Sequence, residues 1–335
     1  MKVVVLHDTI PEQGASPDQT DVLVQAREVS RALQELGYDP ETLSATLDFG
    51  LLRDRLREVR PAFVFNLVES IEGYGRLIHA APSLLDCLEI PYTGAEADAV
   101  FLTTNKLLTK QMLREAAVPT PRAYTSADLL GDTPFAAGLY IVKSVWEHAS
   151  VGLDEDSVVA VSDRAGLGAE MNRLVEKQGG ECFAEAYIEG REFNLSLLGS
   201  KVGPQVLPPA EIRFEGYPEG KTRVVGYRAK WHEGSFEYLH TVRSFEFPSE
   251  DGELLQKLTG LANRCWSLFD LRGYARVDFR VDRDGCPWVL EVNVNPCLSP
   301  DAGFFAAATQ AGLSFTQVVE RIVADCHGVA RQGKA

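Results

Sequence analysis

The residues best suited to chemistry lie in the segment RVDFRVDRDGCPWVLEVNVNP, from Arg276 to Pro296. Two apolar runs joined by an Asp-Gly turn predict a β-hairpin that places Asp278 near Glu291 and Asn293. Glu291 and Asn293 are two residues apart, so they face the same side of the sheet. Two carboxylates and an amide oxygen on one face predict a Mg²⁺ (or Mn²⁺) site. The alternative, a solvated charged face, is disfavoured because the apolar neighbours would leave the acids half-buried without partners.

Two cations accompany this predicted metal site. Arg276 lies two residues before Asp278 on the same strand and therefore faces the same side, although a surface salt bridge is the simpler use for it. Lys143 follows the apolar run LYIV, where an unpaired ammonium would be costly. We therefore expect Lys143 to contact a ligand.

The N-terminal part of the chain has the pattern of a parallel α/β domain. An apolar run at residues 2–6 predicts a buried strand, and apolar residues at helical spacing over 20–36 predict a helix that ends before Gly37. Strand and helix patterns alternate again up to a loop at 91–94. In such a domain the ligand-binding loops gather at the carboxyl ends of the strands.

The rest of the chain alternates less regularly and predicts a small central α+β domain and a C-terminal part with an antiparallel or mixed sheet. The segment 213–247 is rich in Gly, Tyr and charged residues, which is typical of a mobile loop or lid. The expected elements are strands at 140–143, 193–198, 276–281 and 288–293 and helices at 106–116, 165–177 and 314–324.

Composition limits the classes of protein to consider. The 335 residues carry a formal net charge of −15, which argues against a protein that coats nucleic acid or an anionic membrane. The six cysteines form no Cys-x-x-Cys pair, so a reduced, cytoplasmic compartment is expected. No apolar run approaches the roughly 18 residues that span a bilayer. We expect a soluble protein with neither nucleic-acid nor membrane partners.

Five motifs, in order, resemble the ATP-grasp superfamily and specifically the D-alanine–D-alanine ligases. They are NKLLTKQMLREAAVPTP, YIVKSVWEHASVG, CFAEAYIEGREFNLSLLG, GYRAKW and the C-terminal hairpin, and together they cover most of the chain. The resemblance implies an α/β (α+β) ATP-grasp fold with ATP held between the last two domains. The implied boundaries are an N-terminal α/β domain at 1–104, a central subdomain at 105–191, a C-terminal subdomain at 192–328 with its lid at 213–247, and a tail at 329–335.

The resemblance also assigns roles to individual residues. Two lysines would contact the ATP phosphates, the segment after 184 would form the hinge that reads adenine through its backbone, and a glutamate would bind the ribose. Arg276 would stabilise the transferring phosphoryl group and the tetrahedral intermediate. The implied ATP-binding residues are Lys106, Lys143, Glu185, Ala186, Ile188 and Glu192, and the implied catalytic residues are Arg276, Ser150 and Lys230.

The substrate-binding pattern departs from that of the ligases. The glutamate that binds the first substrate has no clear counterpart unless Glu12 or Asp18 replaces it, and the serine that binds the second substrate's carboxylate falls near Ala302. At other family positions this chain has Glu69 for a histidine, His148 and Ala149 for Gly-Ser, Trp231 for a tyrosine and Cys297 for a glycine. The candidate substrate contacts are His7, Glu69, His148, Trp231 and Cys297. For both histidines a loop hydrogen bond is the alternative, and for Cys297 a packed small side chain.

These departures imply a changed substrate with intact ATP chemistry. We therefore expect an ATP- and Mg²⁺-dependent carboxylate–amine ligase that acts through an acyl phosphate on amino-acid-like substrates, with a homodimer as its possible assembly. The general base is either substrate phosphate or Glu69. The alternatives are an authentic D-alanine–D-alanine ligase of cell-wall synthesis and a catalytically silent nucleotide-binding protein. The intact metal and phosphate residues argue against the silent protein.

Overall fold

The computed structural model describes residues 1–335 except 12–13, 148–149, 151, 179 and 329–335, so the predicted tail lies outside the described residues. The N-terminal sheet is parallel, in the order β2-β1-β3. Residues 3–6 of β1 are fully buried and alternate between two hydrophobic clusters, because helices cover both faces of the sheet. The elements are β1 (Lys2–Asp8), α1 (Pro17–Glu35), β2 (Asp39–Ala45), α2 (Phe49–Val59), β3 (Val64–Asn66), α3 (Ala80–Cys87) and α4 (Ala97–Thr104).

The central domain contains a four-stranded antiparallel sheet in the order β4-β7-β5-β6. It is entered through α5 (Lys106–Glu115), whose first turn is capped by the Asn105 side chain, which accepts from the backbone amides of Leu107 and Leu108. Its other elements are β4 (Ala123–Tyr124), α6 (Ser126–Leu130), β5 (Gly138–Ser144), β6 (Val158–Val161), α7 (Arg164–Gln178) and β7 (Cys182–Ala186).

The C-terminal domain is built on a six-stranded antiparallel sheet in the order β11-β10-β8-β12-β13, with β9 paired to β8. The predicted hairpin is confirmed: β12 pairs with β13, and Asp278 lies opposite Glu291 while Arg276 lies opposite Asn293. The elements are β8 (Arg191–Leu198), β9 (Gln205–Val206), β10 (Ala210–Phe214), β11 (Thr241–Ser244), α10 (Gly252–Leu268), β12 (Tyr274–Val281), β13 (Pro287–Asn293), α11 (Gly303–Gln310) and α12 (Phe315–Gly328).

The segment 213–247 is more ordered than the predicted loop. It contains two short helices, α8 (Tyr227–Trp231) and α9 (Phe236–His240), and the strand β11. Aromatic rings hold it together, since Tyr217 packs against Phe236. Lys221 forms ion pairs with Glu237 of the same segment and with Glu155 of the central domain. The lid is therefore a folded element docked on its neighbour, because long-range contacts supply order that its Gly-rich sequence does not predict.

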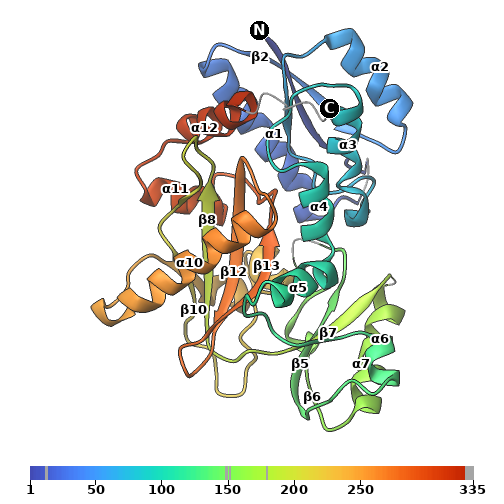
Figure 1. Ribbon diagram of the computed structural model, residues 1–335, viewed down its shortest axis with the longest axis vertical. Helices are drawn as coiled ribbons and strands as arrows, with labels where there is room; N and C mark the ends of the chain where they lie inside the picture. The colour runs from blue at the N-terminus through green and yellow to red at the C-terminus, as the bar shows by residue number, and fades with distance from the viewer. Residues whose placement is uncertain (12–13, 148–149, 151, 179, 329–335) are drawn as a thin grey trace.

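The first two sheets lie within predicted domain ranges, and β8 of the third begins at Arg191, one residue before the range predicted for it. The C-terminal helices extend beyond their own domain. Figure 1 shows α12 beside α1, and a shared hydrophobic cluster contains Val29 and Leu33 from α1 with Val319 and Ile322 from α12. Helix α12 is thus built into the core of the N-terminal domain. No helix among the described residues is long and apolar enough to cross a membrane.

Candidate active site

A cavity of about 550 Å³ lies where the three domains meet, and residues of all three domains line it. It brings together fifteen of the seventeen predicted site residues. These are Glu69, Lys106, Lys143, Ser150, Glu185, Ala186, Ile188, Glu192, Lys230, Trp231, Arg276, Asp278, Glu291, Asn293 and Cys297.

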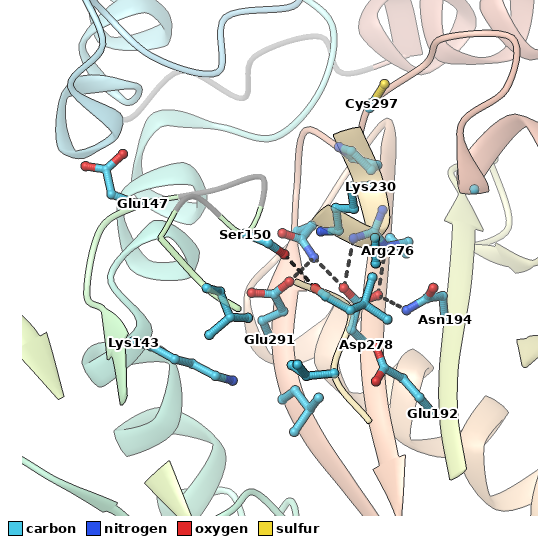
Figure 2. Close-up of a pocket in the computed structure, with 18 of the residues that line it drawn as sticks. Lys143, Glu147, Ser150, Glu192, Asn194, Lys230, Arg276, Asp278, Glu291 and Cys297 are labelled. Atoms are coloured by element: carbon cyan, nitrogen blue, oxygen red, sulfur yellow. Dashed lines mark hydrogen bonds and ion pairs between the residues drawn. The ribbon is translucent and has the colours of Figure 1, made fainter. Parts of the chain in front are cut away.

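The predicted metal ligands form one hydrogen-bonded group on the hairpin (Figure 2). Arg276 donates to both oxygens of Asp278, from Nε at 2.7 Å and from Nη2 at 2.8 Å, and Asn194 Nδ2 donates to Oδ1 at 2.7 Å. Asn293 Nδ2 lies between the two acids, 3.1 Å from Asp278 Oδ2 and 3.2 Å from Glu291 Oε1. Asn194 was not predicted; it is directly opposite Asp278 on β8, and only the strand pairing identifies it.

This group fits a divalent cation. Burial and the adjacent Glu291 carboxylate raise the pKa of Asp278 even though Arg276 opposes that shift. A cation between the two carboxylates would relieve this repulsion. No cluster of three or more His, Cys, Asp or Glu side chains in the described part of the chain is arranged to hold a metal. A metal at the hairpin would therefore take Asp278, Glu291 and the Asn293 amide oxygen and complete its shell with water and ligand oxygens, as Mg²⁺ does.

Positive charge converges on Glu291. Burial raises the pKa of Glu291, but Lys106, Lys230, Lys143 and Arg276 together lower it below its ordinary value, so this carboxylate is ionised. Burial in turn lowers the pKa of Lys106 and of Lys230. Four cations around one carboxylate leave positive charge to be balanced, and a polyphosphate would balance it.

Lys110 is a charged residue that the sequence did not point to. Its ammonium forms an ion pair with Glu185, and both side chains are 1% exposed. Glu185 also accepts from Lys143 at 2.8 Å. Lys143 thus has a protein partner, so the cost of an unpaired ammonium no longer argues for a ligand there. Its place on the cavity wall now carries that argument. Lys110 lies four residues after Lys106 on α5, and this one-turn spacing was the available signal.

The remaining nucleotide-side residues lie on the walls of the same cavity. Glu192 pairs with Arg280 at 2.7 Å across β8 and β12. Ala186 is the last residue of β7, and Ile188 lies two residues beyond it. The Ser150 hydroxyl donates to the carbonyl of Val225 at 3.0 Å, which ties the loop after β5 to the lid. The lid thus forms part of the cavity wall.

The opposite end of the cavity is acidic. Asp18 and Asp21 from α1 and Glu69 from the loop after β3 line it. The Tyr227 hydroxyl of the lid helix α8 donates to Asp18 Oδ1 at 2.6 Å. Of the two expected replacements for the missing family glutamate, Asp18 is therefore in the cavity, and Glu12 lies outside the described residues. Tyr227 was not predicted; it precedes Trp231 by one helical turn, so both present the same face of α8.

We expect the Tyr227→Phe variant to loosen the lid. The change removes the hydrogen bond between α8 and Asp18 and leaves a carboxylate without that donor. Such a bond to a charged group contributes about 1.5 kcal/mol or more, so amide hydrogen exchange in 213–247 should accelerate about tenfold or more. Mass spectrometry of lid peptides measures it. The matched control is Tyr238→Phe, because no hydrogen bond of the Tyr238 hydroxyl is described. If the lid peptides exchange at the same rate in both variants, the hydrogen bond between Tyr227 and Asp18 does not hold the lid in place.

Glu69 is the most strongly perturbed acid at this end. Burial, the Asp8 carboxylate, Asp21 and Asp18 raise its pKa to about 8, while a hydrogen bond from Gln25 at 3.0 Å opposes the shift. Burial also raises the pKa of Asp8 to about 6. Glu69 is therefore mostly protonated at neutral pH and becomes a carboxylate when a positive group approaches it.

The raised pKa of Glu69 predicts a pH-dependent stability. Because the folded state holds this proton up to about pH 8 and the unfolded state loses it near pH 4.5, the free energy of unfolding should fall as the pH rises between these values. The limiting slope is about 1.4 kcal/mol per pH unit. Urea unfolding at pH 7 and pH 8 measures it, a window above the pKa of Asp8. Glu69→Gln should flatten the dependence, whereas an equal slope in both proteins would contradict the assignment.

Cys297 and the two histidines complete the list of predicted contacts. Cys297 Sγ donates to Asp21 Oδ2 at 3.0 Å, and burial together with Glu69 and Asp21 raises the pKa of this thiol well above its usual range. It therefore lines the cavity as a packed thiol, not a nucleophile. His7 is not among the residues that line the cavity. Its Nδ1 instead lies 2.8 Å from the carbonyl oxygen of Asp8, the next residue of β1. His148 lies outside the described residues.

Comparisons with known proteins agree with this arrangement. The family model described as "D-ala D-ala ligase C-terminus" matches residues 138–324. The chain is 32% identical to the uncharacterized protein y4sG of Sinorhizobium fredii, over 90% of this chain and 87% of that protein. It is 29% identical to a D-alanine–D-alanine ligase of Moorella thermoacetica, over 96% of this chain and 98% of that enzyme.

Solved structures show the same fold. The D-alanine–D-alanine ligase of Bacillus anthracis, in a crystal structure complexed with ATP, superposes with a TM-score of 0.73 at 20% identity and covers 98% of both chains. The matched family segment includes the lid, the hairpin and most of the cavity lining. The chain therefore belongs to the D-alanine–D-alanine ligase family, the ADP-forming, ATP-dependent ligases with the ATP-grasp fold.

Proposed function

We propose that this ligase joins amino-acid-like substrates other than two molecules of D-alanine. The observation that carries the proposal is the contrast between the two ends of its cavity. All six implied ATP-binding residues line the cavity, whereas Glu69, Trp231 and Cys297, which depart from the family pattern, form its other end together with Asp21. A site that merely lost contacts would be a weak D-alanine site. Here Cys297 bonds to Asp21 of α1 and Glu69 accepts from Gln25 of α1, which supports a different substrate.

The residues of the chain have distinct parts in the proposed reaction. A substrate carboxylate oxygen bonds to the γ-phosphorus while the bond to the ADP oxygen breaks; the amine nitrogen then attacks the acyl carbon, and phosphate leaves. Lys106 and Lys143 bind the phosphates, and Arg276 stabilises the charge that develops in both steps. Mg²⁺, held by Asp278, Glu291 and Asn293, supplies neutralising charge to the phosphate oxygens. The lid excludes water from the acyl phosphate.

Glu69 is our candidate for the group that takes the proton from the attacking amine. It lines the cavity with Asp18 and Asp21, and these acids attract an ammonium group to this end. The pKa of Glu69, about 8, lies close to neutral pH, and a general base works best when its pKa is near the working pH. All six cysteines are free thiols, which supports our placing this chemistry in the cytoplasm.

The test is ADP formation with a panel of amino acids and dipeptides in the presence of Mg²⁺ and ATP, with the amide product identified by mass spectrometry. We expect turnover with at least one pair other than D-alanine with D-alanine. Rapid turnover with D-alanine alone, near ordinary kcat values of about 10 s⁻¹, would instead identify an authentic D-alanine–D-alanine ligase. No turnover with any pair would favour a silent nucleotide-binding protein.

A further inference from the structure

Arg243 is a cavity-lining cation that the sequence did not single out. It lies on β11, the edge strand of the large sheet, opposite Ile212 of β10. Ile212 is in turn opposite Glu192 of β8, and Glu192 is opposite Arg280 of β12. Residues paired in this way point to the same face of a sheet, so Arg243 belongs to the row that forms the cavity wall.

The bonding state of Arg243 sets it apart from the other arginines of the cavity. Arg276 is held by Asp278 and Arg280 by Glu192. For Arg243, no carboxylate partner occurs among the residues that the structure describes; its Nη1 reaches only the carbonyl of Asp301, at a long 3.4 Å. It also keeps exposed surface. A planar guanidinium with free donors is suited to bind a carboxylate through two parallel hydrogen bonds.

The guanidinium lies at the amino end of α11. A Cβ placed on Gly303 would be 3.5 Å from Arg243 Nη2 and 3.6 Å from its Nε. The preceding Ala302 is the N-cap of α11, where no side chain caps the helix. The family resemblance implies a carboxylate-binding serine near this position, where this chain has Ala302. Arg243 reaches the same place from another strand and offers its guanidinium where no Ala302 hydroxyl exists.

The charges around Arg243 separate it from the phosphate end. The cations that lower the pKa of Glu291 are Lys106, Lys230, Lys143 and Arg276. Figure 2 shows Lys143 reaching toward Glu291 from the side opposite to Arg276. By contrast, Arg276 and Asp301 are the charges that act on Arg243, and its pKa is lowered by burial and by Arg276. Arg276 belongs both to the cations around Glu291 and to the charges around Arg243. An anion bound by Arg243 therefore lies on the far side of Arg276 from the phosphates.

We propose that Arg243 binds the carboxylate of the amine-bearing amino acid and so selects acceptors with a free α-carboxylate. This inference rests on the proposed ligase function. The acceptor would then span the cavity, with its carboxylate on Arg243 and its amine directed toward the acyl carbon near Arg276.

The kinetic test compares each active amino acid with its carboxamide, in the wild type and in Arg243→Met. We expect the KM for the free acid to rise about 10- to 150-fold in Arg243→Met, the range for a hydrogen bond to a charged group, with the KM for ATP unchanged. Discrimination against the carboxamide should disappear. Arg243→Lys keeps the charge but not the fork, so it should lose less. An unchanged KM for the free acid in Arg243→Met would overturn the proposal.

The matched control is Arg213→Met. Arg213 is the adjacent residue to Ile212 on β10 and therefore points to the opposite face, where it bonds to Glu211 and to the carbonyl of Glu246. Its replacement should leave the KM of the amino acid unchanged. An equal rise in both variants would indicate a general effect on the sheet and would overturn the specific role of Arg243.

A binding measurement separates this proposal from the ligase function. Thermal unfolding is followed with Mg²⁺, a non-hydrolysable ATP analogue and each amino acid or carboxamide. Free acids should raise the unfolding temperature of the wild type but not of Arg243→Met, because ligands stabilise the state that binds them. That result without ADP formation would support Arg243 and refute the ligase proposal. Equal shifts in both proteins, or no shift in the wild type, would overturn the role of Arg243.

Discussion

Replacing Glu291 with glutamine is expected to lower kcat for ADP formation by at least about 10²–10³-fold, the scale on which single transition-state contacts act. The change keeps the size of the side chain and removes one negative charge. Glu291 is the carboxylate on which Lys106, Lys230, Lys143 and Arg276 act, and it shares the Asn293 amide with Asp278. The substitution therefore removes both a proposed metal ligand and the negative charge on which these four cations act.

The measurement is a coupled assay of ADP release, with circular dichroism to confirm that Glu291→Gln is folded. Glu253→Gln is a suitable control, because Glu253 lies exposed on α10, outside the cavity lining. A folded Glu291→Gln protein with wild-type turnover would rule out this residue as a metal ligand. A weakened affinity for Mg²⁺, measured by titration at fixed ATP, should accompany the loss of turnover.

The hairpin was predictable because its signals are local. Alternation with a period of two, together with an Asp-Gly turn, determines which side chains share a face, and the observed pairing of Asp278 with Glu291 follows. The helix that begins at Lys106 was predictable for a similar reason, since its apolar spacing and the prolines beyond it lie within one window of sequence.

The residues that escaped prediction have partners far away in the sequence. Tyr227 bonds to Asp18, 209 residues away in the sequence. Arg243 approaches the carbonyl of Asp301, 58 residues further along the chain and just before the amino end of α11. Neither contact has a periodic signature, since each depends on how the lid folds back over the cavity. β2 was likewise not predicted, because most of its residues are only partly buried at the edge of the N-terminal sheet and lack a clear apolar run.

Lys110 forms a buried ion pair within the central domain and reaches the C-terminal domain through Thr120. Its ammonium pairs with Glu185 of β7 and donates to Thr120 Oγ1 at 3.0 Å, and that hydroxyl donates to the carbonyl of Val289 at 2.8 Å. Burial lowers the pKa of Lys110, and Glu185 opposes the shift. One ammonium thus joins α5 to the central sheet and, through Thr120, to the hairpin that carries Glu291.

We expect Lys110→Met to lower the free energy of unfolding by about 3 kcal/mol, the lower part of the range for breaking a buried pair, because Glu185 keeps Lys143 as a partner. Urea denaturation measures this loss. The double variant Lys110→Met, Glu185→Gln should recover part of the stability, since it no longer leaves an undercompensated charge in the interior. Lys110→Met should also raise the KM for ATP, because Glu185 then keeps only Lys143 of its two lysine partners.

The control is Lys177→Met, which breaks the 3.7 Å ion pair with Asp154 on the surface, where the side chains are 58% and 34% exposed. Such pairs contribute little, so no measurable loss of stability is expected. If Lys110→Met is as stable as Lys177→Met, the buried pair does not hold α5 against the central sheet. If the double variant is less stable than Lys110→Met alone, Glu185 stabilises the fold chiefly through its pair with Lys143, which joins β7 to β5.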